Sequence, residues 1–357
     1  MREQDLFYAS VALVSFLAVF MLVPLCRKAA LKLGALDQPD QERKVHRRAV
    51  PYLGGLSFFL AWLLLLIVFA FAAPHRLLPE FYPLAAGGFL IVLLGVYDDI
   101  CDLTSKIKLP LELLLCASLY FWGFKSEVLS NPFGGTVYIG GFALVVTALW
   151  IAGIMNAVNF ADGLDGLAAG LTCICSAVLF FVSFRSGSVF SCTIMAFLFG
   201  ITLAFLCYNF HPASIFMGDA GALFLGFLLG ASTVIERQKG TAVIALSVPV
   251  MVMAVPLLDT VLSFMRRLRR ARSGRFFTPD REHLHHRLLA LGLSQKQVVL
   301  SLYAVALGAG ILAVLFDRVT SGYKMIVLAA VGAAAFCAVA LLRLFESRQQ
   351  WKREKKQ

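Results

Sequence analysis

Long apolar runs alternate with short polar segments along almost the whole chain. A helix that crosses a bilayer needs about 20 apolar residues, and eleven runs reach or approach that length. They cover 6–26, 52–73, 82–97, 109–124, 141–157, 165–184, 191–208, 220–235, 243–265, 298–316 and 324–344. The pattern predicts an all-α polytopic membrane protein with about eleven transmembrane helices, which form a single domain over residues 1–357.

The first apolar run resembles a signal peptide only in its position. The residues before it, among them Glu3 and Asp5, are not a basic cluster, and no small-residue cleavage site follows the run. The basic residues Arg27 and Lys28 come after it instead. We therefore interpret the run as an uncleaved first helix.

The composition excludes several classes of protein. Hydrophobic residues make up 60% of the chain and charged residues 15%, whereas about a quarter of the residues in a soluble domain are charged. A soluble enzyme, a disordered protein and a small disulfide-bonded domain are excluded. Seven of the eight cysteines lie in or beside apolar runs, which indicates packing. Between two of these runs, residues 131–139 predict a turn with a short strand or hairpin.

The net charge of +11 would suggest binding to nucleic acid, but the positions of the charges along the chain indicate otherwise. Of the 32 Lys and Arg residues, 24 fall on one side of the expected helices and 8 on the other. The positive-inside rule then places the N-terminus outside and the C-terminus in the cytoplasm, with membrane lipids and not nucleic acid as the partner of the basic segments. The cytoplasmic segments are 27–51, 98–108, 156–166, 209–219, 266–297 and the basic tail 345–357.

The unusual acidic residues also fall on the cytoplasmic side, although the orientation rests on Lys and Arg alone. Asp98 and Asp99 follow the third apolar run, where two adjacent carboxylates repel each other and oppose the helix dipole. A bound cation or a proton-accepting role explains this pair better than a solvated turn does. Asp102, one turn later, is equally well explained by solvation.

Residues 156–166 place Asn or Asp at every third position, at Asn156, Asn159, Asp162 and Asp165. In a helix or a series of turns this spacing aligns oxygen ligands on one side. Oxygen donors suit Mg²⁺, which usually binds through one or two carboxylates together with substrate phosphates. This segment is therefore a candidate magnesium site.

Two further cytoplasmic segments carry candidate binding residues. In the first, Asp219 begins the next helix, so helix capping is its simpler alternative, and Phe216 either stacks on a base or packs. In the second, a histidine cluster has ligand-like spacing. No Cys or Glu-x-x-His accompanies it, so contacts to phosphate or sugar are favoured over zinc. The cluster consists of His283, His285, His286 and Arg287.

Several of these segments resemble the polyprenyl-phosphate N-acetylhexosamine-1-phosphate transferases, glycosyltransferase family 4. The most specific are the stretch from Asn156 to Gly170 and the stretch from Phe216 to Asp219, and the Asp98–Asp99 pair adds to them. The 283–287 cluster resembles the branch that makes undecaprenyl-diphospho-GlcNAc. The resemblance covers almost the whole chain.

The resemblance implies a bacterial inner-membrane enzyme that joins UDP-GlcNAc, or another UDP-HexNAc, to undecaprenyl phosphate and releases UMP. Asn159 and Asp219 would hold Mg²⁺, for which Mn²⁺ could substitute. Asp162, Asp165 and Phe216 would bind the nucleotide, and His283, His285, His286 and Arg287 the sugar and its phosphate. Lys108 would meet the lipid phosphate, and Asp98 and Asp99 would prepare the acceptor. Lys44, His46 and Asn156 match the family without a clear role.

Some alternatives stay open at this point. Direct attack by the lipid phosphate is favoured over a covalent phospho-Asp intermediate. The donor could instead be another UDP-HexNAc or UDP-MurNAc-pentapeptide, and a homodimer is compatible with the sequence.

A transporter is disfavoured because the acids lie at helix ends and not at the midplane, where transporters place them. Glu112 and Asp259 are the main charges within apolar runs. A CDP-alcohol phosphatidyltransferase is disfavoured because Asp162-Gly163 lacks the arginine and later aspartates that such enzymes carry.

Overall fold

The computed structural model describes residues 3–38, 49–125, 127–130, 136–238, 250, 288–289 and 291–317. Nine of the eleven expected spans lie in this part of the chain, and each coincides with a helix. The expected spans 243–265 and 324–344 lie outside the described residues, as do the tail 345–357 and most of segment 266–297.

The helices follow the apolar runs closely. Their bounds are α1 (Glu3–Leu33), α2 (Leu56–Ala72), α3 (Phe81–Cys101), α4 (Ser105–Phe121), α5 (Ala143–Ala161), α6 (Leu167–Ser186), α7 (Val189–Asn209), α8 (Gly218–Gln238) and α12 (Gln295–Asp317), with short 3₁₀ turns η1 (Pro74–Arg76) and η2 (Gly140–Phe142). In the described part of the chain, seven helices are long and apolar enough to cross a membrane. A polytopic helical membrane protein is thereby confirmed.

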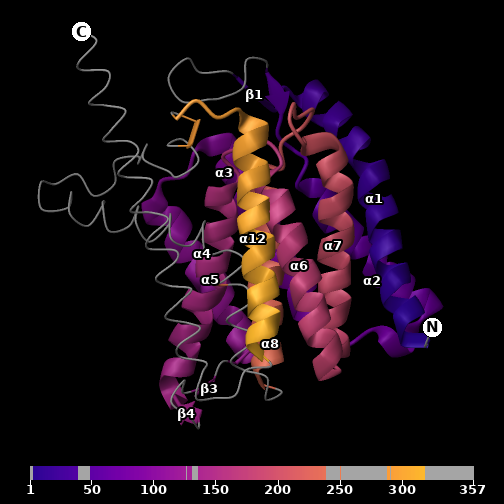
Figure 1. Ribbon diagram of the computed structural model, residues 1–357, viewed down its shortest axis with the longest axis vertical. Coiled ribbons are helices and arrows are strands. Elements are labelled where there is room, and N and C mark those ends of the chain that lie inside the picture. The colour runs from indigo at the N-terminus through magenta and orange to yellow at the C-terminus, as the bar shows by residue number, and fades with distance from the viewer. Residues whose placement is uncertain are drawn as a thin grey trace, which may run out of the picture.

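Two antiparallel strand pairs lie at opposite ends of the helices (Figure 1). At one end β1 (Leu36–Asp37) pairs with β2 (Val50–Pro51). At the other end β3 (Val128–Ser130) pairs with β4 (Thr136–Tyr138), which confirms the predicted hairpin. The first helix begins near the β3–β4 end and runs toward the β1–β2 end (Figure 1).

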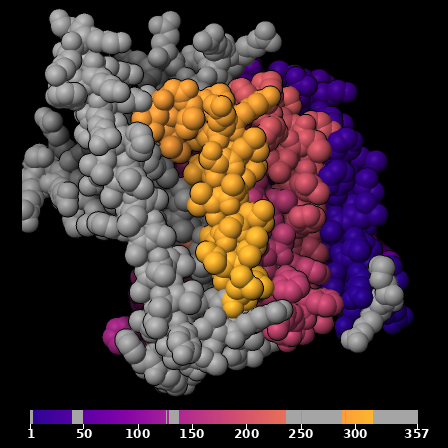
Figure 2. Space-filling model, in the orientation of Figure 1, coloured from indigo at the N-terminus to yellow at the C-terminus, as the bar shows by residue number. Residues whose placement is uncertain are grey.

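Helix α8 is the central helix, because 89% of its apolar window is buried, against 33% for α1 and for α12. It packs against α3 on one side and α5 on another. Its small residues permit close approach, as is usual where helices associate in lipid. In Figure 2, α12 runs down the middle of the face and α1 lies along its right-hand edge. Both helices expose large apolar side chains, such as Ile311 and Leu13.

Candidate active site

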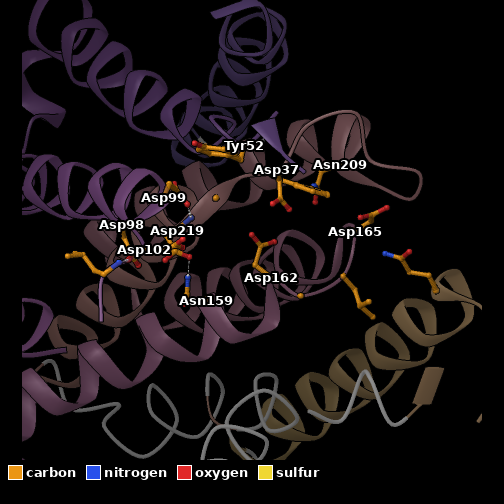
Figure 3. Close-up of a pocket in the computed structure, with 16 residues that line it drawn as sticks. Asp37, Tyr52, Asp98, Asp99, Asp102, Asn159, Asp162, Asp165, Asn209 and Asp219 are labelled. Carbon is orange, nitrogen blue, oxygen red and sulfur yellow. Dashed lines mark hydrogen bonds between the residues drawn. The ribbon is translucent and has the colours of Figure 1, made fainter. Parts of the chain in front are cut away.

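A cavity of about 620 Å³ opens where α3, α5 and α8 meet, at the same end as β1–β2 (Figure 3). It is strongly acidic, because seven of the side chains that line it are aspartates. The lining consists of Asp37, Tyr52, Asp98, Asp99, Asp102, Leu103, Asn159, Asp162, Gly163, Leu164, Asp165, Asn209, Phe216, Gly218, Asp219 and Gln295. The cavity therefore joins three of the segments that the sequence analysis singled out.

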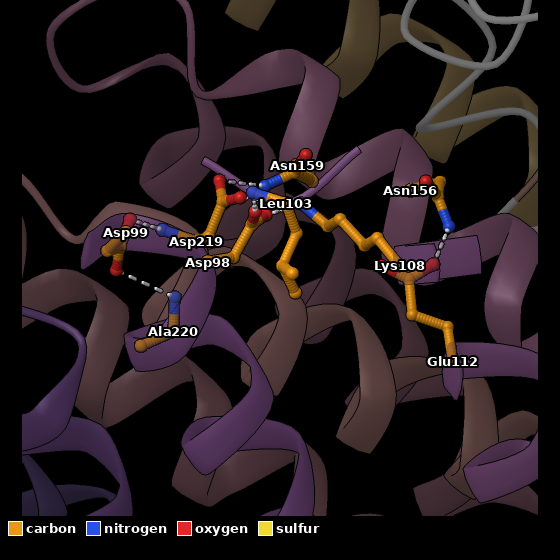
Figure 4. A network of polar contacts seen from close by, with 9 residues as sticks. All are labelled: Asp98, Asp99, Leu103, Lys108, Glu112, Asn156, Asn159, Asp219 and Ala220. Atoms are coloured by element: carbon orange, nitrogen blue, oxygen red, sulfur yellow. Dashed lines mark hydrogen bonds and ion pairs between the residues drawn. The ribbon is translucent and has the colours of Figure 1, made fainter. Parts of the chain in front are cut away.

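A lysine holds two carboxylates together at the centre of this end (Figure 4). Lys108 Nζ, on the first turn of α4, lies 2.6 Å from Asp98 Oδ2 and 2.5 Å from Asp219 Oδ2. Asn159 Nδ2 donates to the other oxygen of Asp219 at 2.7 Å. The backbone N–H of Leu103 donates to Asp98 Oδ1 at 2.7 Å. Charge-assisted hydrogen bonds of this kind fix both carboxylates in position.

Asp99 faces a different way from its neighbour Asp98, because successive residues on a helix point about 100° apart. Its Oδ1 accepts the N–H of Asp219 at 2.8 Å, and its Oδ2 accepts the N–H of Ala220 at 3.3 Å. Asp99 thus caps the first turn of α8 from another helix. The simpler alternative for Asp219, that it caps its own helix, is not what the structure shows, because its carboxyl faces Lys108 and Asn159.

Glycines bring α8 close enough for these contacts. A Cβ at Gly95 of α3 would lie 2.4 Å from the Cα of Ala220, and one at Gly55 would lie 2.2 Å from the backbone of Gly221. The N–H groups of Gly54 and Gly55 also bond the carbonyls of Phe216 and Met217 at 2.9 and 2.8 Å. Only glycine permits these approaches of backbone to backbone.

The regular spacing of residues 156–165 does not produce one row of ligands. Helix α5 ends at Ala161, so Asn156 and Asn159 lie on the helix while Asp162 and Asp165 lie in the turn after it. Asn159, Asp162 and Asp165 line the cavity. Asn156 instead donates to Glu112 Oε2 of α4 at 2.5 Å. The prediction of one aligned set of oxygens was wrong for Asn156, because this residue lies one helical turn before Asn159 and its amide faces Glu112 instead of the cavity.

Asp165 is held by the segment after α7. Its Oδ2 accepts from the backbone N–H of Ala213 at 3.1 Å and lies 2.7 Å from His211 Nδ1. Asn209 supports the same turn, since its Oδ1 accepts the N–H of Gly166 at 3.0 Å and its Nδ2 donates to the carbonyl of Ile215 at 2.9 Å. These bonds join the two cavity-lining turns.

The environment of Asp162, in the turn after α5, disfavours a negative charge on its carboxyl. Burial raises its pKa well above the usual range, and the nearby carboxyls of Asp219, Asp99 and Asp165 raise it further. Nothing in its own turn compensates for this repulsion as Lys108 does for Asp98 and Asp219. A cation near Asp162 would relieve it.

The structure brings together most of the predicted residues that it describes. Asp98, Asp99, Asn159, Asp219 and the nucleotide candidates share the cavity, and Phe216 is half-buried in its wall. Lys108 contacts two of the lining carboxylates from α4. The remaining predicted residues, Lys44, His46, His283, His285, His286 and Arg287, lie outside the described residues.

Sequence reasoning gave no site role to Asp37, Tyr52 and Gln295, which also line the cavity. Burial and the carboxyls of Asp99, Asp37 and Asp102 raise the pKa of the Tyr52 phenol. Tyr52 and Gln295 are ordinary polar residues next to apolar runs and carry no local signal.

The residues present fit a magnesium ion. No three His, Cys, Asp or Glu side chains are arranged as a metal cluster within the described ranges. Mg²⁺ does not need such a cluster, because it keeps several waters and takes one or two carboxylates plus phosphate oxygens. The Lys108 ammonium already lies between Asp98 and Asp219, so this position favours positive charge.

Known proteins resemble this chain over most of its length. It is 35% identical over 309 residues to a probable undecaprenyl-phosphate N-acetylglucosaminyl 1-phosphate transferase of Bacillus subtilis, covering 86% of this chain and 84% of that protein. The sequence model described as glycosyl transferase family 4 matches residues 81–237. The chain belongs to this family.

Two further relatives are 34% and 30% identical to this chain. A decaprenyl-phosphate N-acetylglucosaminephosphotransferase of Mycobacterium tuberculosis is 34% identical, with 87% of this chain and 82% of the relative aligned. An undecaprenyl-phosphate alpha-N-acetylglucosaminyl 1-phosphate transferase of Escherichia coli K12 is 30% identical, with 86% and 84% aligned. The segment matched by the family model, 81–237, contains the Lys108 network and most of the cavity wall.

Proposed function

We propose that this protein transfers N-acetylglucosamine 1-phosphate from UDP-GlcNAc to a polyprenyl phosphate, giving a polyprenyl-diphospho-sugar and UMP. One observation carries the proposal beyond the names of the relatives. An acidic cavity lies at the helix ends, and a lysine beside it bridges two of its lining carboxylates. A lipid phosphate and a nucleotide diphosphate can meet there at the membrane surface. The names of the relatives give undecaprenyl phosphate and decaprenyl phosphate as acceptors, and we propose the bacterial cytoplasmic membrane as the location.

The chemistry requires two anions to approach each other, so positioning and charge compensation dominate. The acceptor phosphate is already an oxyanion, and little proton removal is needed. An ammonium has three N–H donors, and the contacts of Lys108 to Asp98 and Asp219 use two of them. The third would bind a phosphate oxygen of the acceptor and orient it toward the donor.

Direct attack by the acceptor is favoured over a covalent phospho-Asp intermediate. Both oxygens of Asp98 accept hydrogen bonds, one from Leu103 N–H and one from Lys108. Both oxygens of Asp99 accept from the backbone of α8. Hydrogen bonds to both oxygens stabilise the negative charge of a carboxylate and so lower its nucleophilicity.

We further propose that Asp219 and Asn159 hold Mg²⁺, with Asp162 nearby. When bound, the ion would neutralise the diphosphate and stabilise the UMP leaving group as a Lewis acid. Seven lining aspartates would otherwise repel both substrates. Asp165 and Phe216 would contact the base, and the 283–287 cluster the sugar and its phosphate.

The experiment that tests the function is transfer of radiolabelled sugar phosphate to undecaprenyl phosphate by the purified protein. A panel of UDP-GlcNAc, UDP-GalNAc and UDP-MurNAc-pentapeptide identifies the donor, and added EDTA tests the metal. We expect UDP-GlcNAc to be used and UMP to be released. Absence of lipid-linked product with every donor, in protein that is folded and supplied with Mg²⁺, would refute the proposal.

The proposed orientation places the cavity in the cytoplasm, with eleven spans, the N-terminus outside and the C-terminus inside. The β3–β4 hairpin and the start of α1 would then face outward, at the end away from the cavity (Figure 1). A fluorescent protein fused to the C-terminus should fluoresce. The exposed Cys101, beside the cavity, should resist an impermeant thiol reagent in intact cells. Labelling of Cys101 under those conditions would contradict the orientation.

A further inference from the structure

Helix α4 has a narrow buried face that contains a charged residue among apolar ones. Its buried residues are Glu112, Cys116 and Leu119, and Lys108 precedes them by one turn. Residues at this spacing lie on one face of a helix. Most of the remaining surface of α4 is exposed, so this buried face decides how the helix is rotated against α5.

Glu112 is the unexpected member of this buried face, because its side chain has no exposed surface. Its Oε2 accepts from Asn156 Nδ2 of α5 at 2.5 Å. Its Oε1 is buried and has no hydrogen-bond partner among the described residues. Burying a carboxyl destabilises the fold unless the carboxyl is hydrogen-bonded, so an apolar residue at this position would give a more stable helix contact. What Glu112 adds, and an apolar residue would not, is the hydrogen bond to Asn156.

The Glu112–Asn156 bond lies beside the Lys108 network (Figure 4). Lys108 comes four residues before Glu112 on α4, and Asn159 comes three residues after Asn156 on α5. Lys108 and Asn159 both bind the carboxyl of Asp219. The same faces of α4 and α5 are therefore joined twice, once through Asp219 at the cavity and once through Glu112 a turn deeper.

We propose that Glu112 is a positioning residue of the transfer site: through its bond to Asn156 it sets the rotation of α4, so that Lys108 stays between Asp98 and Asp219. This inference rests on the proposed function. Glu112 does not line the cavity and touches no reacting group. Its effect on transfer passes through the placement of the Lys108 ammonium.

Two substitutions separate the hydrogen bond from the packing. Glu112→Gln keeps the length and an oxygen acceptor for Asn156. Glu112→Met keeps the bulk and removes the acceptor, while Asn156 Nδ2 retains its second bond, to the carbonyl of Ala152 at 2.9 Å. As matched controls, Glu127→Gln and Glu127→Met alter a half-buried acid just before the β3–β4 hairpin, whose Oε1 lies 3.8 Å from Lys125 Nζ.

We expect Glu112→Met to lower kcat about tenfold, the effect of one lost hydrogen bond, and to raise the KM for polyprenyl phosphate more than that for UDP-GlcNAc. Glu112→Gln should stay close to the wild type, and both Glu127 variants should be unaffected. Asn156→Ala in the Glu112→Gln background removes the donor without leaving a buried carboxylate unpaired. It should reproduce Glu112→Met and provides a second variant if methionine at 112 impairs folding.

Amide hydrogen exchange supplies a readout that does not depend on activity. Residues 105–112 should exchange faster in Glu112→Met than in Glu112→Gln or the wild type. Wild-type kinetics and exchange in Glu112→Met would overturn the inference. Equal loss of activity in Glu112→Gln and Glu112→Met, with unchanged exchange, would also overturn it, because the carboxyl would then act chemically. If the wild type transfers no sugar phosphate, the proposed function fails, while exchange still judges the positioning role.

Discussion

Replacing Gly95 by alanine should disable the site without removing any polar group. The added Cβ would lie 2.4 Å from Ala220 Cα, 2.5 Å from Ala220 N and 2.9 Å from the carbonyl carbon of Asp219. All three atoms belong to the backbone of α8, so no side chain can rotate away. Ordinary contact begins at 3.4 Å, and α3 and α8 must therefore separate by about 1 Å at this point.

A separation of that size breaks the cap that Asp99 supplies. Its bonds to the N–H groups of Asp219 and Ala220 are 2.8 and 3.3 Å long. The longer one would be lost, at a cost of about 1.5–3 kcal/mol for a hydrogen bond to a charged group. Asp219 would also move relative to Lys108. A misplacement of about 1 Å at a reacting centre can cost about 100-fold in rate, and we expect kcat to fall by that order.

The assay is radiolabelled sugar-phosphate transfer, with folding checked by thermal unfolding in detergent. Gly153→Ala on α5 is the matched control, because a Cβ there meets nothing within 4 Å. That variant should keep its activity and gain up to about 1 kcal/mol in helix propensity. If folded Gly95→Ala protein is as active as Gly153→Ala protein, the argument that close packing positions Asp219 is refuted.

Substitutions at three further positions test the proposed roles. Asp219→Ala should abolish turnover, and Asp219→Asn should be nearly as damaging because an amide binds Mg²⁺ and Lys108 poorly; a near-normal rate at saturating Mg²⁺ would count against both roles. Lys108→Met should raise the KM for undecaprenyl phosphate, or lower kcat, with little change in the KM for UDP-GlcNAc, and steady-state kinetics showing the reverse would contradict the assignment. Because the pKa of Asp162 is raised in the native state, native stability should fall as the pH rises from about 4, the unfolded value. In metal-free protein, Asp162→Asn should remove the part of this pH-dependent loss of stability that Asp162 causes. The check is the melting temperature measured across this pH range. If the variant's melting temperature falls with pH as steeply as that of the wild type, the pKa of Asp162 is not raised in the native state.

Local patterns in the sequence were sufficient to predict the helices and the end of the helix bundle at which the candidate active site lies. An apolar run of sufficient length forms a helix in a membrane whatever its neighbours are, because its backbone must satisfy its own hydrogen bonds there. The nine described helices were predicted from such runs, and the β3–β4 hairpin from the turn signal in residues 131–139. The acidic segments meet because an alternating chain returns to the same side after every second helix.

The roles of individual polar residues were decided only by tertiary structure. Asp98 and Asp99 are adjacent and chemically identical, yet one binds Lys108 and the other caps α8, 120 residues further along the chain. Asn156 and Asn159 share a motif, but one faces Glu112 and the other Asp219. Which face of a helix meets which partner depends on close contacts such as Gly95 against Ala220, and these arise from packing between distant segments that no local pattern encodes.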